Sequence, residues 1–387
     1  MDFRLTEEQE LLLESVDQFI EQAKEAGFDA DYLKKCDTDM RYPIEYMKML
    51  NESGLGLLAL PEEHGGAGVD LVTLMLVCER FGRKGYPSGA GAALSIDDML
   101  EFGSPEQCAF VSSKVAEGKG GFSLGITEPG AGSDNNAMAT TAKINGDGTV
   151  TINGSKSFVT NGDNADYLLV VARDAEPINP KLWASMWFVP INAPGITMSP
   201  MHKIGWKSEG NMCEVTFNDV VVPESALVGK RGMGFLQLMK NFEIERLVMC
   251  VGALGVAEQA MDFAAAYTSE RVTFGKPIGS YQLIQQKLVE NEIAIMNMRN
   301  MILETAWKKD NGISIRTEVN LAKYYCARAA CEVVDNCLQI MGGIGYIDDC
   351  IISKCYRDIR AFRIGAGTDE IMIHIAGREL VKKYARN

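Results

Sequence analysis

Apolar positions along the 387-residue chain follow two different periodicities, which divide it into three zones. In residues 1–118 and 229–387 apolar residues recur roughly every three to four positions, as they do in amphipathic helices. In residues 119–228 short apolar or alternating segments are separated by turn residues, as in β-strands. The pattern predicts an α+β multidomain protein whose three domains have these bounds.

The two helical zones differ in the length of their predicted helices. The first opens with Thr6 and Gln9, which are spaced as a capping box ahead of an apolar-periodic stretch. The last contains long periodic stretches joined by short glycine-containing connections, which predicts an antiparallel four-helix bundle. These stretches are Phe235 to Arg271, Tyr281 to Gly312, Ser314 to Gly343 and Thr368 to Asn387.

The middle zone predicts strands without helices between them. The segments are Thr149 to Gly162, Tyr167 to Arg173, Ser185 to Ile191 and Cys213 to Pro223. This order favours a small barrel or sandwich over βαβ units. The glycine-rich stretches of the chain border helices and do not follow these strands, so a dinucleotide-binding Rossmann domain is disfavoured.

Composition and charge narrow the class of protein. A net charge of −14 argues against a nucleic-acid surface, which needs a basic face. The ten cysteines include no CxxC pair and the three histidines form no HExxH pattern, so we expect buried free thiols in a reducing cytosol and no metal site. No leader segment and no long apolar run is recognised, so we expect a cytoplasmic protein without a membrane span.

Two loops carry candidate chemistry. In LGITEPGAGSDNNAM (124–138), a tight turn at Pro129 to Gly132 presents backbone N–H groups, with the hydroxyls of Thr127 and Ser133 beside it. Such a loop holds a carbonyl-rich ring or an anion, or is simply a polar surface turn. The second loop, IGAGT (364–368), is a phosphate cradle, a helix connection or an active-site wall. Acidic residues at the helix start after it make it a poor anion cradle.

Five segments together, in order and spacing, resemble the acyl-CoA dehydrogenase family over nearly the whole chain. They are ITEPGAGSD (126–134), INGSKSFVTNG (152–162), ERVTFGKPIGSYQLIQQKL (270–288), LQIMGGIGY (338–346) and RDIRAFRIGAGTDEI (357–371). The resemblance implies an N-terminal helical domain, a middle β-barrel and a C-terminal antiparallel four-helix bundle. It also implies non-covalent FAD, an acyl-CoA or 2-enoyl-CoA substrate, and a homotetramer built as a dimer of dimers.

The same resemblance implies which residues contact the flavin. One group lies on the loop and strand of the middle domain: Leu124, Ile126, Thr127, Gly132, Ser133, Phe158 and Thr160. A second group is expected to meet FAD across a subunit interface: Arg271, Phe274, Gln282, Gln339 and Gly343. Thr368 and Glu370 lie beside FAD as well. Phe158 replaces the tryptophan of most relatives, and Arg271 would otherwise be an ordinary helix-end charge.

The catalytic base is the feature in which this chain departs from many relatives. They carry a glutamate directly before Gly-Thr, where this chain has Ala366. The isovaleryl-type branch instead carries its base on the first long bundle helix, immediately before an arginine, and Glu245 precedes Arg246 here. Glu245 is therefore the predicted catalytic residue, with burial expected to raise its pKa. Ser133, Glu243, Arg246, Ala366 and Gly367 are the expected substrate-binding residues.

Within the family, the chain is most similar to the crotonobetainyl-CoA and caffeoyl-CoA reductase branch of bacteria. Such enzymes reduce a 2-enoyl-CoA with electrons from electron-transferring flavoprotein, so a similar activity and partner are implied. Two alternatives stay open: a catabolic short branched-chain acyl-CoA dehydrogenase of isovaleryl type, and a non-catalytic flavin or CoA-ester binding scaffold. The acyl group, the direction, electron bifurcation and the lifetime of the partner complex stay open too.

Overall fold

The chain divides into two compact units, each built from segments that are distant in the sequence. The computed structural model describes residues 4–90 and 96–385. Unit 1 comprises residues 1–22, 67–91 and 243–387, and unit 2 comprises the remaining residues. The N-terminal helices are shared between the units, because some contact the C-terminal helices and others contact the sheet.

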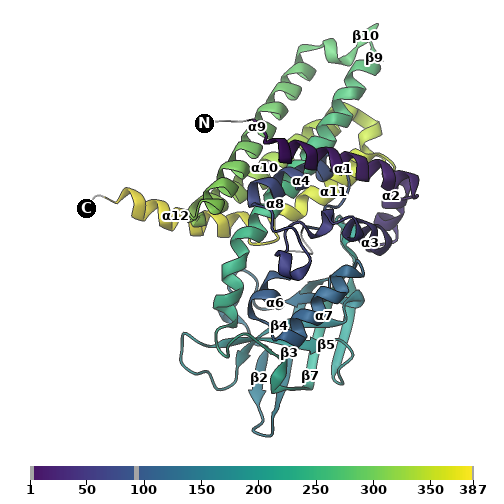
Figure 1. Ribbon diagram of the computed structural model, residues 1–387. Coiled ribbons are helices and arrows are strands. Elements are labelled where there is room, and N and C mark those ends of the chain that lie inside the picture. The colour runs from purple at the N-terminus through teal and green to yellow at the C-terminus, as the bar shows by residue number, and fades with distance from the viewer. Residues whose placement is uncertain (1–3, 91–95, 386–387) are drawn as a thin grey trace. The chain divides into compact units, whose positions relative to one another are not determined.

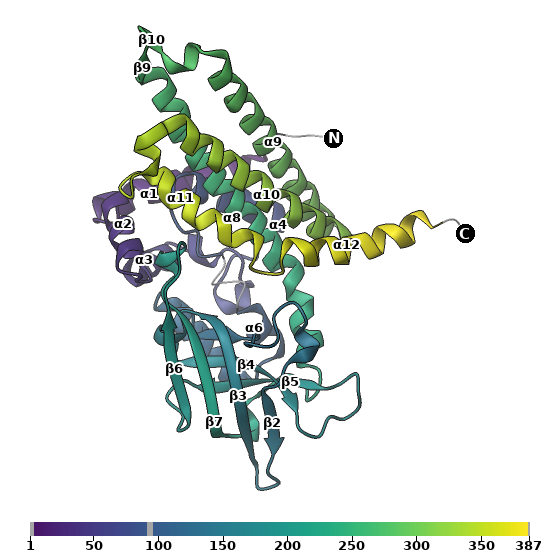
Figure 2. The same ribbon diagram turned by 180° about the vertical axis from the view of Figure 1, so that it is seen from behind.

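Unit 1 is helical and its long helices are antiparallel (Figures 1 and 2). Lys287 donates a hydrogen bond to Asn336, whereas Lys308, further along the first helix, donates to Glu318, earlier on the second. The predicted four-helix bundle is confirmed, but a short helix that includes part of the basic run was missed. The elements are α1 (Glu7–Glu25), α4 (Leu71–Arg83), α8 (Gly234–Glu270), α9 (Gln282–Asp310), α10 (Arg316–Met341), α11 (Ile351–Ile359), α12 (Asp369–Tyr384), and the hairpin of β9 (Val272–Thr273) and β10 (Lys276–Pro277).

Helices α4 and α8 approach each other at two glycines. A Cβ atom on Gly82 would lie 3.0 Å from the Cα atom of Gly255, so neither position has room for a side chain. Beside this crossing, Arg299 of α9 forms salt bridges with Glu79 of α4 and Glu258 of α8. A partly buried ionic group thus connects three helices.

One segment of α8 is long and apolar enough to cross a membrane by length and composition. It is Phe242–Glu270, and 56% of its most apolar window is buried inside the protein. Its burial is what a central bundle helix shows.

Unit 2 contains an eight-stranded sheet with short helices. The strand order is β6-β7-β3-β2-β4-β5-β8, and β1 pairs in parallel with β4. The strands are β1 (Phe122–Gly125), β2 (Thr141–Ile144), β3 (Thr149–Thr160), β4 (Tyr167–Asp174), β5 (Ala184–Pro190), β6 (Ile196–Met201), β7 (Met212–Pro223) and β8 (Leu227–Val228). The helices are α2 (Ala30–Thr38), α3 (Ile44–Glu52), α6 (Asp97–Phe102) and α7 (Pro105–Ala116).

Both faces of the sheet are buried, which explains the continuous apolar runs of β4 and β5. Leu169 and Val171 join a core with residues of α6 and α7, whereas Leu168 and Val170 face the opposite core. That second core also contains the inward-facing residues of β3 and β7. The sheet therefore curls around its own core, as expected for the predicted β-barrel.

The short 3-10 helices mostly lie in connections between these elements. They are η1 (Leu55–Leu57), η2 (Glu62–His64), η3 (Asn135–Ala137), η4 (Gly162–Asn164), η5 (Lys207–Glu209), η6 (Glu224–Ala226), η7 (Ile278–Ser280), η8 (Gly342–Tyr346) and η9 (Arg360–Arg363). Two of them border the candidate site: η3 follows the first loop and η9 precedes the second.

Candidate functional site

The first loop of interest leaves β1 and closes at once into a tight turn. The N–H of Glu128 donates to the carbonyl of Ala131 over 3.0 Å, and the N–H of Ala131 returns a bond to Glu128 over 3.1 Å. Asp134 then accepts a bond from the N–H of Asn136 and so caps η3. Between these fixed points Gly132 and Ser133 are exposed, so the predicted turn with accessible backbone is confirmed.

A buried ion pair holds this loop against β3. The Nζ atom of Lys156 lies 2.7 Å from Oε1 of Glu128 and also donates to the carbonyl of Ile126 over 2.9 Å. The same carboxylate accepts bonds from the backbone N–H groups of Ala139 and Thr140. Burial lowers the pKa of Lys156 to about 8, against the opposite effect of Glu128. The hydrogen bonds from Lys156, Thr140 and Ala139 outweigh the burial of Glu128 and lower the pKa of its carboxyl group.

A register shift in β3 turns Phe158 outward. The pairing of β3 with β7 slips between Lys156 and Val159, so two adjacent residues, Lys156 and Ser157, are both buried. Phe158 takes a φ of 59°, which is rare for a non-glycine residue, and its side chain is 55% exposed. Thr160, two residues further on, is exposed as well.

The structure brings the loop and the bulge together. The N–H of Ser157 donates to the carbonyl of Thr127 over 2.8 Å, so Thr127 lies beside Phe158. Leu124, Ile126 and Thr127 are partly exposed. An exposed aromatic side chain, nearby hydroxyls and free backbone suit a flat aromatic ring with a polar edge. These residues of unit 2 therefore fit the isoalloxazine ring that the resemblance implies.

In unit 1, two buried cations hold the second loop through its carbonyl groups. Nε of Arg246 donates to the carbonyl of Ala366 over 3.2 Å, and Nζ of Lys323 donates to the carbonyl of Gly367 over 2.5 Å. Ala366 has a φ of 52° and Gly367 a φ of 99°, so the backbone here is left-handed. Within the described chain, the N–H of Ala366 has no hydrogen-bond acceptor.

Glu245 lies on α8 next to Arg246 and hence near this turn. Its side chain reaches solvent, so the prediction that it is buried was wrong. The protein around it still desolvates the carboxyl group enough to raise its pKa, although Arg246 and Lys323 act in the opposite direction. A carboxylate that is accessible to a ligand and yet protonates readily suits proton transfer.

Other expected residues of this loop lie at the start of α12. Thr368 is the N-cap and accepts a bond from the N–H of Ile371 through its hydroxyl. Glu370 is exposed in the first helical turn. Asp369, between them, is buried and pairs with Arg363 at 2.7 Å. Glu243, two residues before Glu245, lies 3.8 Å from Lys309 of α9.

The remaining predicted flavin residues gather at the far end of the bundle. Arg271 and Phe274 belong to the β9–β10 hairpin, and Phe274 is 93% exposed at its turn. Gln282 begins α9 at the end where Lys287 bonds to Asn336, close to Gln339 and Gly343. Since α10 rises 1.5 Å per residue, Gln339 lies about 24 Å along the helix from Lys323. Within one chain, the predicted flavin residues at the far end of the bundle therefore lie apart from the turn at Ala366.

Sequence reasoning missed the two buried lysines that hold the loops. Lys156 occupies a core-facing position of the alternating segment Thr149 to Gly162, and Lys323 lies in an apolar stripe of α10 with Val319 and Cys326. A lysine at a core position was the available signal, since lysine is almost never fully buried without a partner.

One motif was overlooked and carries no chemistry. Residues 121–125 spell GFSLG, which matches the GxSxG pattern of serine hydrolases. That pattern needs a serine on a sharp turn between a strand and a helix. Ser123 is instead a buried residue inside β1, so it is not placed as a nucleophile.

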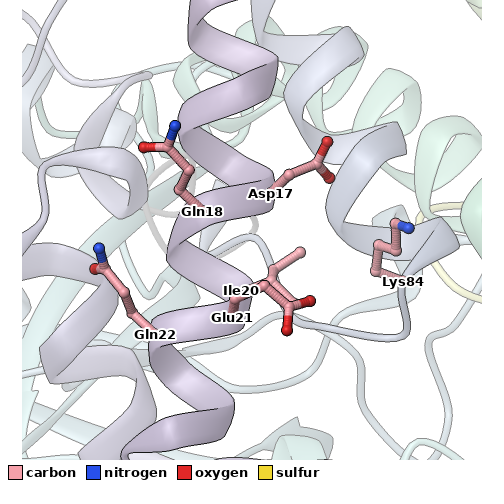
Figure 3. Close-up of a pocket in the computed structure, with 6 residues that line it drawn as sticks. All are labelled: Asp17, Gln18, Ile20, Glu21, Gln22 and Lys84. Atoms are coloured by element: carbon pink, nitrogen blue, oxygen red, sulfur yellow. The ribbon is translucent and has the colours of Figure 1, made fainter.

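Two surface pockets of unit 1 include none of the predicted residues. One is lined by Asp17, Gln18, Ile20, Glu21, Gln22 and Lys84. Figure 3 shows that the carboxylates of Asp17 and Glu21 lie on the side of α1 nearer Lys84, while the two glutamines point away. The other pocket adjoins Arg299. All ten cysteines are free, and the described residues include no cluster of three or more potential metal ligands.

Family models match almost the whole chain. The models are described as acyl-CoA dehydrogenase N-terminal domain for residues 6–119, middle domain for residues 123–220 and C-terminal domain for residues 232–381. A curated relative, the probable acyl-CoA dehydrogenase YdiO of Escherichia coli K12, is 47% identical over 386 residues, which cover 99% of both chains.

Solved structures agree with this assignment. Butyryl-CoA dehydrogenase from Megasphaera elsdenii is 30% identical with a TM-score of 0.86, and the match covers 98% of this chain and 100% of that one. A chain from the structural study of the electron transferring flavoprotein of Acidaminococcus fermentans is 29% identical with a TM-score of 0.89, covering 99% of this chain and 100% of that one.

Proposed function

Because the chain belongs to the acyl-CoA dehydrogenase family, we propose that it reduces a short or functionalised 2-enoyl-CoA, with Glu245 as the proton donor. The family already makes the chain an FAD-dependent enzyme of acyl-CoA dehydrogenation. The direction, the electron donor and the role of Glu245 are the proposed part.

The observation that carries this proposal is the link between Glu245 and the turn at Ala366. The residue after Glu245, Arg246, bonds to the carbonyl of Ala366. Ala366 has no acidic group, so the only carboxylates near its turn come from other positions. Asp369 is buried and paired with Arg363, and Glu370 is exposed in the next helix. Glu245 has the accessibility and the raised pKa that a proton-transfer group needs.

Individual residues of the chain would then have different roles in this reaction. When bound, FAD supplies the hydride that is exchanged with the β carbon of the thioester through N5. Glu245 gives a proton to the α carbon during reduction and takes one during dehydrogenation, so the two directions use the same groups. We propose that the N–H of Ala366 polarises the thioester carbonyl, which makes the α position more acidic. Ser133, Glu243, Arg246 and Gly367 are the proposed substrate contacts.

We propose that FAD is held by residues of two subunits. Leu124, Ile126, Thr127, Gly132, Ser133, Phe158, Thr160, Thr368 and Glu370 would serve the flavin of their own subunit. The set at the far end of the bundle, namely Arg271, Phe274, Gln282, Gln339 and Gly343, would reach the FAD of a second copy. The exposure of Phe274 and of Leu283, 93% and 76%, supports burial in a homotetramer. Light scattering of the purified protein tests this assembly.

Electrons are proposed to come from electron-transferring flavoprotein in the bacterial cytoplasm. The similarity to a chain studied together with such a flavoprotein supports this partner. The test is turnover of crotonobetainyl-, caffeoyl- and acrylyl-CoA with the reduced flavoprotein, compared with isovaleryl-CoA and a dye acceptor. Preference for isovaleryl-CoA would assign the catabolic alternative instead.

The role of Glu245 is tested by Glu245→Gln, with Glu332→Gln as the matched control. Both changes remove one carboxylate from the helices of unit 1, but Glu332 is an exposed residue of α10 away from the turn. Loss of a general acid or base lowers turnover by roughly 10²- to 10⁴-fold. Full activity of Glu245→Gln with flavin bound would reject Glu245. A wild-type protein that binds thioesters and turns none over would favour the scaffold alternative.

A further inference from the structure

We propose that Lys323 is a positioning residue for the proton-transfer group, because it holds the Ala366–Gly367 turn and places a buried positive charge facing Glu245. This inference rests on the proposed function of Glu245. Lys323 belongs to α10, whereas Glu245 belongs to α8 and the turn precedes α12. One side chain thus connects the three elements around the site.

Lys323 is buried without the direct salt bridge that usually accompanies a buried lysine. Its side chain is 1% exposed, and in the described parts of the chain no carboxylate lies within salt-bridge distance of its Nζ atom. Its hydrogen bond goes to a carbonyl, that of Gly367. Burial lowers the pKa of Lys323 to about 8. The buried carboxylate of Asp369 has the largest electrostatic effect on Lys323 and opposes this shift. A buried ammonium group without a direct ion pair still costs folding free energy, which directs attention to the turn that Lys323 holds.

Several groups act electrostatically on Lys323, Asp369 most strongly, and among these groups in the described chain Glu245 is the exposed one without an ion pair. Asp369 on α12 pairs with Arg363 of η9, and Cys250 and Arg246 lie on α8. Glu243 pairs with Lys309 of α9, and it acts on Arg246. Glu245 remains, reaching solvent and within electrostatic reach of Lys323. Below about pH 8 the charge on Lys323 favours the ionised form of Glu245, which opposes the effect of desolvation.

The hydrogen bond of Lys323 also shapes the turn. Arg246 and Lys323 bind two successive carbonyls, those of Ala366 and Gly367, from the buried side. A Cβ atom on Gly367 would lie 2.6 Å from Cε of Met372, so this backbone packs closely against α12. Fixing both carbonyls also fixes the two peptide planes that follow Ala366, which carry the N–H groups of Gly367 and Thr368. Lys323 thus acts on the proton donor and on the backbone that directly follows the proposed thioester contact at Ala366.

The test separates the charge from the hydrogen bond. Lys323→Gln keeps a donor for Gly367 without the charge, Lys323→Met removes both, and Lys323→Arg keeps both. Lys308→Met is the control, because Lys308 is a lysine of the same helix bundle that pairs with Glu304 and Glu318 away from the turn. The readout is an infrared titration of the Glu245 carboxyl band, identified by its loss in Glu245→Gln. This measurement needs no turnover.

We expect the Glu245 band to titrate about one pH unit higher in Lys323→Met and Lys323→Gln. Lys323→Arg and Lys308→Met should titrate like the wild type. The apparent pKa in the pH profile of turnover should rise by the same amount in either reaction direction. The value of kcat should fall more in Lys323→Met than in Lys323→Gln. Unchanged titration in both neutral variants overturns the inference, even if activity falls. If the band shifts while Glu245→Gln stays active, the inference stands and the proposed role of Glu245 fails.

Discussion

Among the residues that the structure describes, two lysines are buried, one in each unit, and they differ in what surrounds the ammonium group. Lys156 is 0% exposed and lies 2.7 Å from the carboxylate of Glu128, which two backbone N–H groups also satisfy. Lys323 is 1% exposed and bonds to a backbone carbonyl. Burial lowers the pKa of both to about 8. The same pKa therefore arises from two different sets of partners.

The difference separates a structural lysine from a functional one. A buried pair contributes little net stability, but removing one partner leaves the other charged and unpaired. Loss of Lys156 would therefore leave the buried carboxylate of Glu128 without its counter-ion. Lys323 makes no direct ion pair in the described chain, and its removal leaves the buried Asp369 carboxylate with Arg363 as its partner. Its direct contact is the backbone of the Ala366–Gly367 turn, which directs attention to the site that it faces.

The largest expected effect is that of Lys156→Met. We expect a loss of roughly 3–5 kcal/mol in unfolding free energy, because the buried Glu128 carboxylate loses its counter-ion. Urea denaturation measures this loss. The double variant with Glu128→Gln should recover part of it, since the remaining group is neutral. A double variant as unstable as the single one would show that Lys156 acts through packing, and not through the pair.

Lys323→Met should change the unfolding free energy at pH 7 by less than about 1 kcal/mol, because a lost hydrogen bond is offset by relief from burying a charge. The unfolding free energy of the wild type should depend on pH through Lys323. The folded pKa of about 8 lies below the unfolded value near 10.5, so the folded wild type binds fewer protons between these values and gains stability as the pH rises. The variant lacks this gain. Urea titrations should therefore show that the unfolding free energy of the wild type increases relative to that of the variant between pH 7 and pH 10. An unchanged difference between the two proteins would contradict a buried ammonium group.

The sequence predicted the fold better than the supports of the site. Helical and alternating patterns identified the bundle and the sheet, since burial enforces periodicity over many residues. The loop at Thr127 and the turn at Ala366 were found because small residues and hydroxyls mark them locally. Lys156 and Lys323 were not found, because their meaning depends on Glu128 and Gly367, which lie 28 and 44 residues away. Similarly, solvent access at Glu245 depends on neighbouring helices, and flanking apolar residues suggested burial instead.

An effect on cofactor binding, smaller than that of Lys156→Met on stability, is expected for Phe158→Ala, two residues after the structural lysine. Loss of an aromatic contact of about 1–1.5 kcal/mol should weaken FAD binding roughly 5- to 13-fold, while folding of the apoprotein changes little because the side chain is exposed. Fluorescence titration of the apoprotein with FAD measures the change. Val221→Ala is the control, since Val221 is similarly exposed on β7. Equal losses of FAD affinity in both variants would show that Phe158 does not contact the flavin.

The smallest effect concerns the turn that Lys323 holds. Ala366 has a φ of 52°, a conformation that costs a residue with a Cβ atom roughly 1–2 kcal/mol relative to glycine. Ala366→Gly should therefore raise the unfolding free energy by up to about 1 kcal/mol, after the greater freedom of glycine in the unfolded chain is subtracted. Ala361→Gly, in η9, lacks this strain and should lower stability by about 0.5–1 kcal/mol. Opposite signs in thermal denaturation would confirm that Arg246 and Lys323 hold the backbone in a strained shape. If both variants lose stability, the turn is relaxed and the two cations are not needed to maintain it.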